Sequence, residues 1–139
     1  MRPFTEGDRA TLEALYRACR LEALWLPIAA RARSHFSRDT RGERIHVAVG
    51  PAGEPDGFIS AWEPDAFIHH LYVRSAVRGR GVGGMLLDSL SGHVARPWRL
   101  KCLRSNTRAL AFYLKRHWKE VSSGEGDEGP YALLETHET

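Results

Sequence analysis

The chain has 139 residues, of which 42% are hydrophobic and 27% charged, and its formal net charge is +3. This composition is that of an ordinary globular protein and excludes a disordered tail. No apolar run approaches the roughly 20 residues that a membrane span requires, and the N-terminus lacks the pattern of a signal peptide. We therefore expect a cytoplasmic protein with no membrane partner, and the mixing of basic with acidic residues gives no reason to expect a nucleic acid partner.

Helical and strand patterns alternate along the chain without a linker or repeat, which predicts a single domain over residues 1–139. Asp8 can cap a first helix with one apolar face, and residues 28–36 can form a second helix after Pro27. Three strand patterns follow, and the Gly, Pro and Asp turns between them predict an antiparallel meander. These strands are expected at residues 45–49, 57–62 and 67–73.

After the third strand the pattern becomes glycine turn, helix, strand, helix and strand. The two helices are expected to end near residues 93 and 117, and the strands to cover 98–103 and 131–135. A strand, helix and strand in this order predict a right-handed crossover and a locally parallel strand pair. The predicted fold class is mixed α/β or α+β, with helices on both faces of the sheet.

The most informative segment covers residues 78–84 and reads Arg-Gly-Arg-Gly-Val-Gly-Gly. A glycine-rich turn that leads into a helix presents backbone N–H groups and the positive end of a dipole to a phosphate. Glycine permits positive φ and close approach of an anion, and the two arginines can add charge-assisted hydrogen bonds. The turn therefore predicts a cofactor that carries a diphosphate.

The spacing of Gly79, Gly81 and Gly84 also fits the G-x-G-x-x-G motif of dinucleotide-binding folds. That motif usually opens its domain, whereas here half the chain precedes it and about 55 residues follow. No carboxylate lies in residues 99–104, where the ribose-binding acid is expected, although the arginines there suit a 2′-phosphate. An NADP-binding oxidoreductase stays open as an alternative.

Two sequence blocks point to a particular family. Arg78, Gly81 and Gly83 fit Arg/Gln-x-x-Gly-x-Gly, and residues 106–113 fit Asn-x-x-Ala-x-x-Phe-Tyr. With these blocks in this order, the chain resembles the GNAT superfamily of acyl-CoA-dependent N-acetyltransferases over nearly its whole length. The family commonly has a Gly-Phe pair after the second block, where this chain has His-Trp at 117–118.

The resemblance implies acetyl-CoA as co-substrate, no metal, and the GNAT fold, a mixed and mostly antiparallel central sheet with helices on both faces. In that fold the strand matching 67–73 splays from its parallel neighbour 98–103, and the pantetheine arm pairs with the exposed strand edge. The diphosphate would lie on the glycine turn, and Asn106 would contact the pantetheine arm or only cap its helix. The implied cofactor-binding residues are Leu71, Val73, Arg78, Gly79, Arg80, Gly81, Val82, Gly83, Gly84 and Asn106.

The implied reaction is direct attack of a primary amine on the thioester in a ternary complex, which needs a base for the amine and an acid for the thiolate. Tyr113 matches the family's general acid, with a purely structural core role as the alternative. A backbone amide near Leu71 would polarise the carbonyl. The resemblance favours His69 as the base, a bulge in its strand would favour His70 instead, and Glu63 or water stay open.

Cys102 is expected to be a packed thiol rather than an acetyl carrier. Trp25 and Trp62 are candidates for the wall of the acceptor pocket. The acceptor itself is a small-molecule or peptide amine, acetyl could be another short acyl group, and a non-catalytic acyl-CoA-binding regulator is the main alternative. Dimerisation is common in the family, so a homodimer stays open. Four acids near the strand turns would favour a cationic amine: Glu54, Asp56, Glu63 and Asp65.

Overall fold

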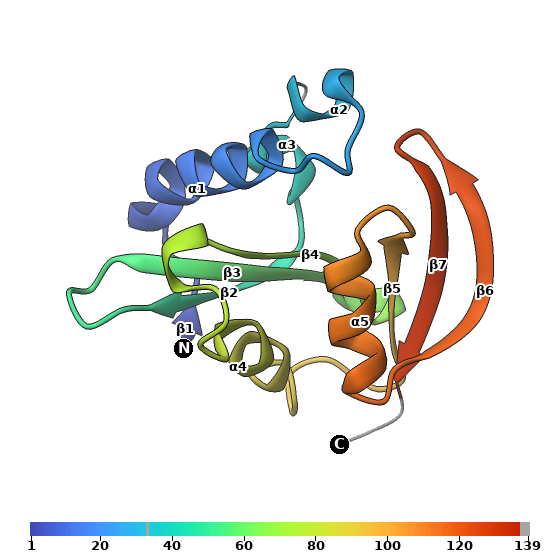
Figure 1. The fold of residues 1–139 in the computed structure, drawn as a ribbon. Helices are drawn as coiled ribbons and strands as arrows, with labels where there is room; N and C mark the ends of the chain where they lie inside the picture. The colour runs from blue at the N-terminus through green and yellow to red at the C-terminus, as the bar shows by residue number, and fades with distance from the viewer. Residues whose placement is uncertain (33, 137–139) are drawn as a thin grey trace.

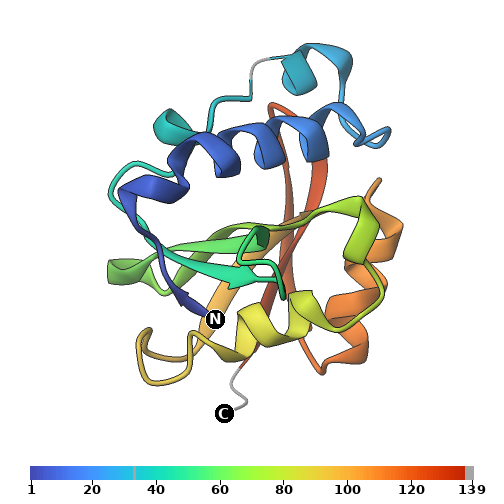
Figure 2. The ribbon, with the colours of Figure 1, turned by 90° about the vertical axis from the view of Figure 1, so that its left-hand side faces the viewer.

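The computed structural model of the protein describes residues 1–32 and 34–136. They form a seven-stranded sheet in the order β1-β2-β3-β4-β5-β7-β6, with α1, α2 and α3 on one face and α4 and α5 on the other (Figures 1 and 2). The strands are β1 (Arg2–Pro3), β2 (Arg44–Val49), β3 (Pro55–Trp62), β4 (Phe67–Val73), β5 (Trp98–Leu103), β6 (Lys119–Gly126) and β7 (Gly129–Thr136), and the helices are α1 (Arg9–Leu21), α2 (Ile28–Ala32), α3 (Phe36–Asp39), α4 (Val82–Asp88) and α5 (Thr107–Lys115).

The sheet is mixed and mostly antiparallel, because β4 and β5 are its one parallel pair of neighbours among the described strands. This confirms the predicted fold class, with helices on both faces and a parallel pair at its centre. A doubly wound dinucleotide fold instead requires a run of parallel strands. The sheet is therefore not that of the NADP-binding alternative.

Two apolar clusters pack the helices onto the sheet. On one face the apolar side of α1 meets β2, β3 and the buried ring of Phe36 in α3, and Phe58 of β3 lies at the centre of this cluster. On the other face α4 and α5 pack on residues such as Ile59 of β3 and Leu100 of β5. Because side chains alternate along a strand, neighbours such as Phe58 and Ile59 fill opposite clusters. The apolar face of α1 consists of Leu12, Leu15, Tyr16 and Cys19, which are all buried.

Two predicted helices have different bounds in the structure. The expected helix over 28–36 is divided, because His35 adopts an extended conformation and caps a separate helix, with its side chain accepting a hydrogen bond from the Arg38 N–H. The helix expected to reach residue 93 ends at Asp88, and the chain continues through turns that include Gly92 at φ +84°.

Two strands, the two-residue β1 and the longer β6, were not expected. The side chains of β6 are almost all exposed, so Lys119–Gly126 shows no alternation of apolar and polar residues. β6 forms by pairing with β7 as an antiparallel hairpin. Among the described residues, no helix combines the length and the apolar character that crossing a membrane requires.

Candidate active site

The two parallel strands at the centre of the sheet separate soon after they meet. β4 and β5 pair only through Phe67 with Arg99 and Ile68 with Leu100. Beyond these pairs, the edge of β4 that faces β5 is open. The structure therefore has the splayed parallel pair that the resemblance implies.

Backbone donors of β4 face this opening. The Arg74 N–H donates to the Asp56 carbonyl, which lies on the β3 side of the strand. Because N–H groups alternate between the two edges of a strand, those of Leu71 and Val73 face the β5 side. These are the two residues expected to pair with a pantetheine arm.

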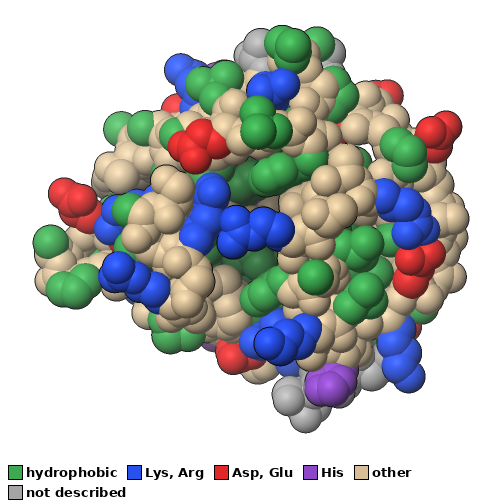
Figure 3. Space-filling view, viewed as in Figure 1, with side chains coloured by type: hydrophobic (Ala, Val, Ile, Leu, Met, Phe, Trp, Pro, Cys, Tyr) green, Lys and Arg blue, Asp and Glu red, His purple; other side chains and the backbone are tan. Residues whose placement is uncertain are grey.

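A cavity of about 510 Å³ passes through the opening. Among the residues that the structure describes, those that line the cavity come from α1, the loop after α1, α3, β4, β5, α5 and the turn between β6 and β7. The molecular surface is hollowed on the face that shows β4, α5 and β7 (Figure 3). Segments far apart in the sequence are held together here, since the Ser105 hydroxyl donates to the Trp25 carbonyl (2.9 Å).

The glycine turn lies between β4 and α4. Gly79 and Gly81 have φ values of +81° and +83°, a conformation that favours glycine. The first hydrogen bond within α4 runs from the Met85 N–H to the Gly81 carbonyl (3.1 Å), so the N–H groups of residues 82–84 have no partner inside the helix. The turn therefore offers backbone donors in the arrangement expected for an anion site.

The two arginines of the turn differ. Arg78 folds back, because its Nε donates to the Val73 carbonyl (2.9 Å) and its NH2 lies 3.5 Å from the Cys19 Sγ. Arg80 is exposed and forms no ion pair with any residue that the structure describes. Arg78 thus braces the turn, and Arg80 is the side chain left to meet a phosphate.

Tyr113 lies in α5, is 8% exposed and lines the cavity. Burial raises the pKa of its phenol strongly, and the neighbouring Cys102 and Tyr72 add to the effect. Its hydroxyl therefore stays protonated at neutral pH, and it makes no hydrogen bond to any residue in the described chain. A buried phenol with an uncommitted proton fits the role of a general acid.

Two other residues that line the cavity near Tyr113 also have structural roles. The Asn106 side chain accepts a hydrogen bond from the Ala109 N–H (3.3 Å), so it caps α5 while also lining the cavity. Cys102 belongs to the apolar cluster, and burial raises the pKa of its thiol to about 11. A thiol that stays protonated is a poor nucleophile, which agrees with the expected packing role.

β4 is bulged at the two histidines. Ser60 of β3 pairs with His70 and the next residue, Ala61, pairs with Ile68, so His69 is the extra residue of the bulge. His69 is exposed and His70 is half-buried, and both line the cavity. This is the condition under which the sequence favours His70 over His69.

The ring of His70 has a fixed orientation. Its Nε2 lies 3.1 Å from the Asp39 carbonyl, and because a carbonyl only accepts, Nε2 carries the hydrogen. The neutral ring then has its lone pair on Nδ1, for which the described residues supply no donor. Burial lowers the pKa of His70 below its ordinary value, which keeps the ring neutral near pH 7.

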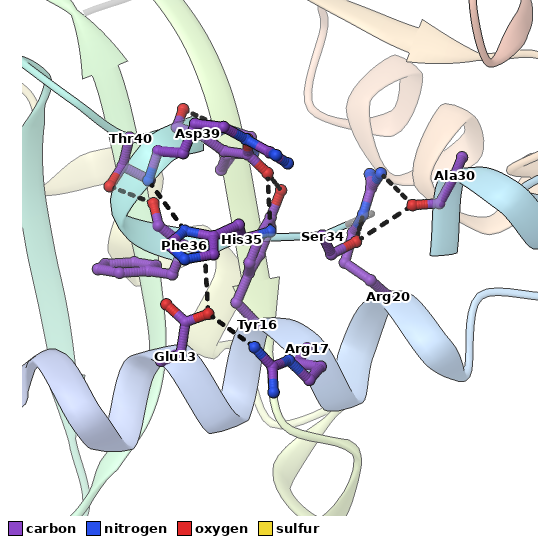
Figure 4. Close-up of polar contacts among 12 residues, drawn as sticks. Glu13, Tyr16, Arg17, Arg20, Ala30, Ser34, His35, Phe36, Asp39 and Thr40 are labelled. Carbon is purple, nitrogen blue, oxygen red and sulfur yellow. Dashed lines mark hydrogen bonds and ion pairs between the residues drawn. The ribbon is translucent and has the colours of Figure 1, made fainter. Parts of the chain in front are cut away.

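Asp39 holds this arrangement from α3. Its carboxylate accepts hydrogen bonds from the Tyr16 hydroxyl (2.7 Å) and the His35 N–H (3.2 Å), as Figure 4 shows. Burial alone would raise the pKa of Asp39, but the hydrogen bonds from Tyr16 and Arg38 lower it. The short helix α3 is thereby fastened to α1, and its last carbonyl is aimed at His70.

His69 has a different partner. Its Nδ1 is paired with Oε2 of Glu43, a carboxylate whose side chain is only 4% exposed. The ring of His69 is thus held by a buried acid, whereas the ring of His70 is held by a carbonyl.

Several expected site residues lie elsewhere. Trp25 lines the cavity, but Trp62, the last residue of β3, is not among the lining residues and its ring lies beside Gly42. Glu63 is ion-paired with Arg44 (2.8 Å) outside the cavity, so its position does not support a role as base. The expectation that acids near the strand turns give the acceptor pocket a negative charge is wrong, because the other three acids do not line the cavity either. Glu54 precedes β3, Asp56 lies within β3, and Asp65 lies between β3 and β4.

Sequence reasoning missed Tyr16, Asp39 and Glu43 as site residues. Tyr16 fits the apolar face of α1, and the two acids lie in a charged stretch without a motif. Only the packing of α1 and α3 over β4 brings Tyr16 and Asp39 to the cavity, whereas Glu43 is not a lining residue and is connected to the site through its pairing with His69. No group of three or more His, Cys, Asp or Glu that could hold a metal occurs among residues 1–32 and 34–136.

Several solved structures are similar to this chain in fold. The apo form of YjaB from Escherichia coli has a TM-score of 0.74 at 24% identity, with 96% of this chain and 92% of that chain covered. A phosphinothricin acetyltransferase from Sinorhizobium meliloti, solved with AcCoA, has a TM-score of 0.72 at 19% identity, with coverage of 97% and 85%. NAA60 from Arabidopsis thaliana, solved with acetyl-CoA, has a TM-score of 0.69 at 16% identity, with coverage of 97% and 96%. No curated protein sequence gives a significant match.

The chain thus shares its fold, with the open strand pair and the glycine turn, with these structures. The family model for the acetyltransferase (GNAT) family matches residues 9–118. The chain therefore belongs to the GNAT family of acetyltransferases.

Proposed function

We propose that the protein transfers an acetyl group from acetyl-CoA to a primary amine by direct attack within a ternary complex. The observation that carries this proposal is the cavity through the open strand pair, because Tyr113 lines it from α5 and His70 lines it from β4. A proton acceptor and a proton donor thus border one space, which is the requirement of amine acylation.

Acetyl-CoA fits the donors that border the opening. The free N–H groups of Leu71 and Val73 can pair with the amides of a pantetheine arm, as one more strand pairs with a sheet edge. The glycine turn, with the N–H groups of residues 82–84 and the side chain of Arg80, can bind the diphosphate. Two structurally similar proteins were solved with this molecule, which supports its assignment here.

In the proposed reaction His70 accepts a proton from the amine at Nδ1, and the amine nitrogen attacks the thioester carbonyl carbon. The carbonyl oxygen gains negative charge and is stabilised by a backbone N–H of β4 near Leu71, a fixed dipole. As the carbon–sulfur bond breaks, Tyr113 donates its proton to the departing sulfur. His70 takes the role of base, rather than His69, because it is neutral, has a fixed tautomer and is not paired with a carboxylate.

Substitution of Tyr113 by Phe tests the reaction. We expect kcat to fall by about 100-fold, because a general acid typically contributes that much or more. The Kd for CoA should change by less than about twofold, since the ring and its packing are kept. The measurement is thiol release from acetyl-CoA over a panel of amines, with CoA binding followed by calorimetry.

Tyr131→Phe is the matched control, because Tyr131 is not among the residues that line the cavity. An equal loss of kcat and of CoA affinity in Tyr113→Phe would show that Tyr113 only supports the fold. CoA binding without thiol release for any amine would instead indicate a non-catalytic acyl-CoA-binding regulator.

A further inference from the structure

The cavity has an excess of positive charge. Among the residues that the structure describes, five charged side chains line it, and three of these are basic. Four of the five form two ion pairs: Arg20 with Glu128 (2.6 Å) and Arg38 with Asp39 (3.0 Å). The remaining cation is Lys101 of β5, whose ammonium has no carboxylate partner in the part of the chain that the structure describes.

Lys101 borders the opening itself. It follows Leu100, the last residue of β5 that pairs with β4. Leu100 and Cys102 belong to the cluster under α4 and α5, so the side chain of Lys101 points to the opposite face. That is the face on which His70 contacts Tyr16 of α1 (ring centroids 5.4 Å apart). The ammonium therefore stands on the same side of the sheet as the proposed base.

Its surroundings hold Lys101 in place without neutralising it. The Nζ lies 4.8 Å from the centre of the Tyr131 ring on the neighbouring strand β7. Glu135, on the same face of β7, is ion-paired with Arg99 (2.6 Å). A cation fixed over an aromatic ring, beside an open cavity, is suited to bind an anionic group of a ligand.

We infer that the acceptor amine also carries a carboxylate, which Lys101 binds, so that the acceptor class is amino acids rather than simple amines. This inference rests on the proposed acetyl transfer. The carboxylate makes an ion pair with the ammonium while the amino group of the same molecule lies near His70. Trp25 and Leu26 give the cavity an apolar wall, so amino acids with apolar side chains are the probes of choice.

The test compares leucine, methionine and phenylalanine with their decarboxylated amines, isopentylamine, 3-(methylthio)propylamine and phenethylamine. Thiol release is measured for the wild type, Lys101→Met and Lys101→Arg. We expect Lys101→Met to raise the KM of the amino acids by about 10-fold or more, because a charge-assisted hydrogen bond is lost. The KM of the amines should change by less than about twofold, and Lys101→Arg should restore most of the preference. Ratios between variants for one substrate cancel the intrinsic reactivity of its amino group.

Lys119→Met is the matched control, since Lys119 is exposed at the start of β6 and does not line the cavity. The inference is overturned if amines are acetylated but the wild type does not prefer the amino acids, or if the preference survives in Lys101→Met. It is also overturned if Lys101→Met weakens CoA binding by the same factor. Absence of thiol release with every acceptor would overturn the acetyl transfer itself, and the inference with it.

Discussion

His117 shows how a single residue can fix the C-terminal end of α5, the helix that contains Tyr113. It adopts φ +70°, in the left-handed region, just after the end of α5. The Trp118 N–H bonds to the Tyr113 carbonyl and the His117 N–H to the Leu114 carbonyl (both 3.1 Å), which is the Schellman pattern. The ring of Trp118 packs on Tyr113 with centroids 5.4 Å apart. The glycine that the family commonly has here is absent, but the helix exit keeps the shape that glycine favours.

Replacing His117 by Gly should therefore stabilise the protein. The left-handed conformation costs a residue with a Cβ about 1 kcal/mol relative to glycine, although a more flexible unfolded chain offsets part of this gain. We expect an increase of about 0.5–1 kcal/mol in the free energy of unfolding, measured by urea denaturation. His117→Ala keeps the Cβ and is the control. A loss of stability in the glycine variant would show that the side chain of His117 contributes an interaction of its own.

The choice between the two histidines is also decided at the level of residues. If His70 is the base, kcat/KM should fall as the pH is lowered and the ring is protonated. Because burial lowers the pKa of His70, the midpoint of this acidic limb of the pH profile should lie below about pH 6.5. We expect His70→Gln to lower kcat/KM by about 100-fold and to remove this limb. His69→Gln should keep the limb, since its ring is paired with Glu43. The reverse pattern in the two pH profiles would assign the base to His69.

Among the elements, the glycine turn makes the sharpest demand on backbone conformation. Gly81 is the residue before α4, at φ +83°, and no atom lies within 4 Å of the place of a Cβ there. The conformation alone, rather than crowding, favours glycine at this position. A side chain introduced there changes charge and strain without displacing a neighbour.

Gly81→Asn and Gly81→Asp separate these two effects. Both residues tolerate the left-handed conformation better than most and have similar shapes, but only Asp brings a negative charge toward the diphosphate. We expect Gly81→Asp to weaken CoA binding by about 10-fold more than Gly81→Asn, with a difference that shrinks at high salt. Calorimetric titration with CoA at low and high salt measures this. Equal affinities of the two variants would place the diphosphate away from the turn.

For the whole molecule, several buried groups make stability depend on pH in the same direction. Burial lowers the pKa of His46 and of His70, so both are neutral when folded and take up protons on unfolding. Hydrogen bonds from Arg2 hold the pKa of the buried Asp8 at about 2. For each group, the unfolded chain binds more protons than the folded protein at pH values between the two pKa values, so stability rises with pH over that interval.

The histidine contribution should be complete above about pH 6.5 and lost as the pH falls through the lower pKa values of the folded protein. The Asp8 contribution should be lost below about pH 4. We expect the melting temperature to fall from pH 7 to pH 5 and again below pH 4. In the double variant His46→Gln, His70→Gln the melting temperature should change less between pH 7 and pH 5. An unchanged slope in that variant would assign the effect to other groups.

The sequence by itself determined the main secondary-structure elements and the family of this protein. Periodicity located α1 and β4, and the blocks at 78–84 and 106–113 identified the family, because both depend on local backbone requirements such as positive φ and helix capping. Local patterns carried no signal for β6, whose residues are exposed and which forms only by pairing with β7.

Only the tertiary structure decided how the site is assembled. The bulge that makes His69 the extra residue depends on the register between β3 and β4, and not on either strand alone. Tyr16, Asp39 and Lys101 come from distant segments and meet at the cavity because α1 and α3 pack over the point where β4 and β5 separate. Contacts between such segments depend on packing across the sheet, which no local pattern of residues encodes.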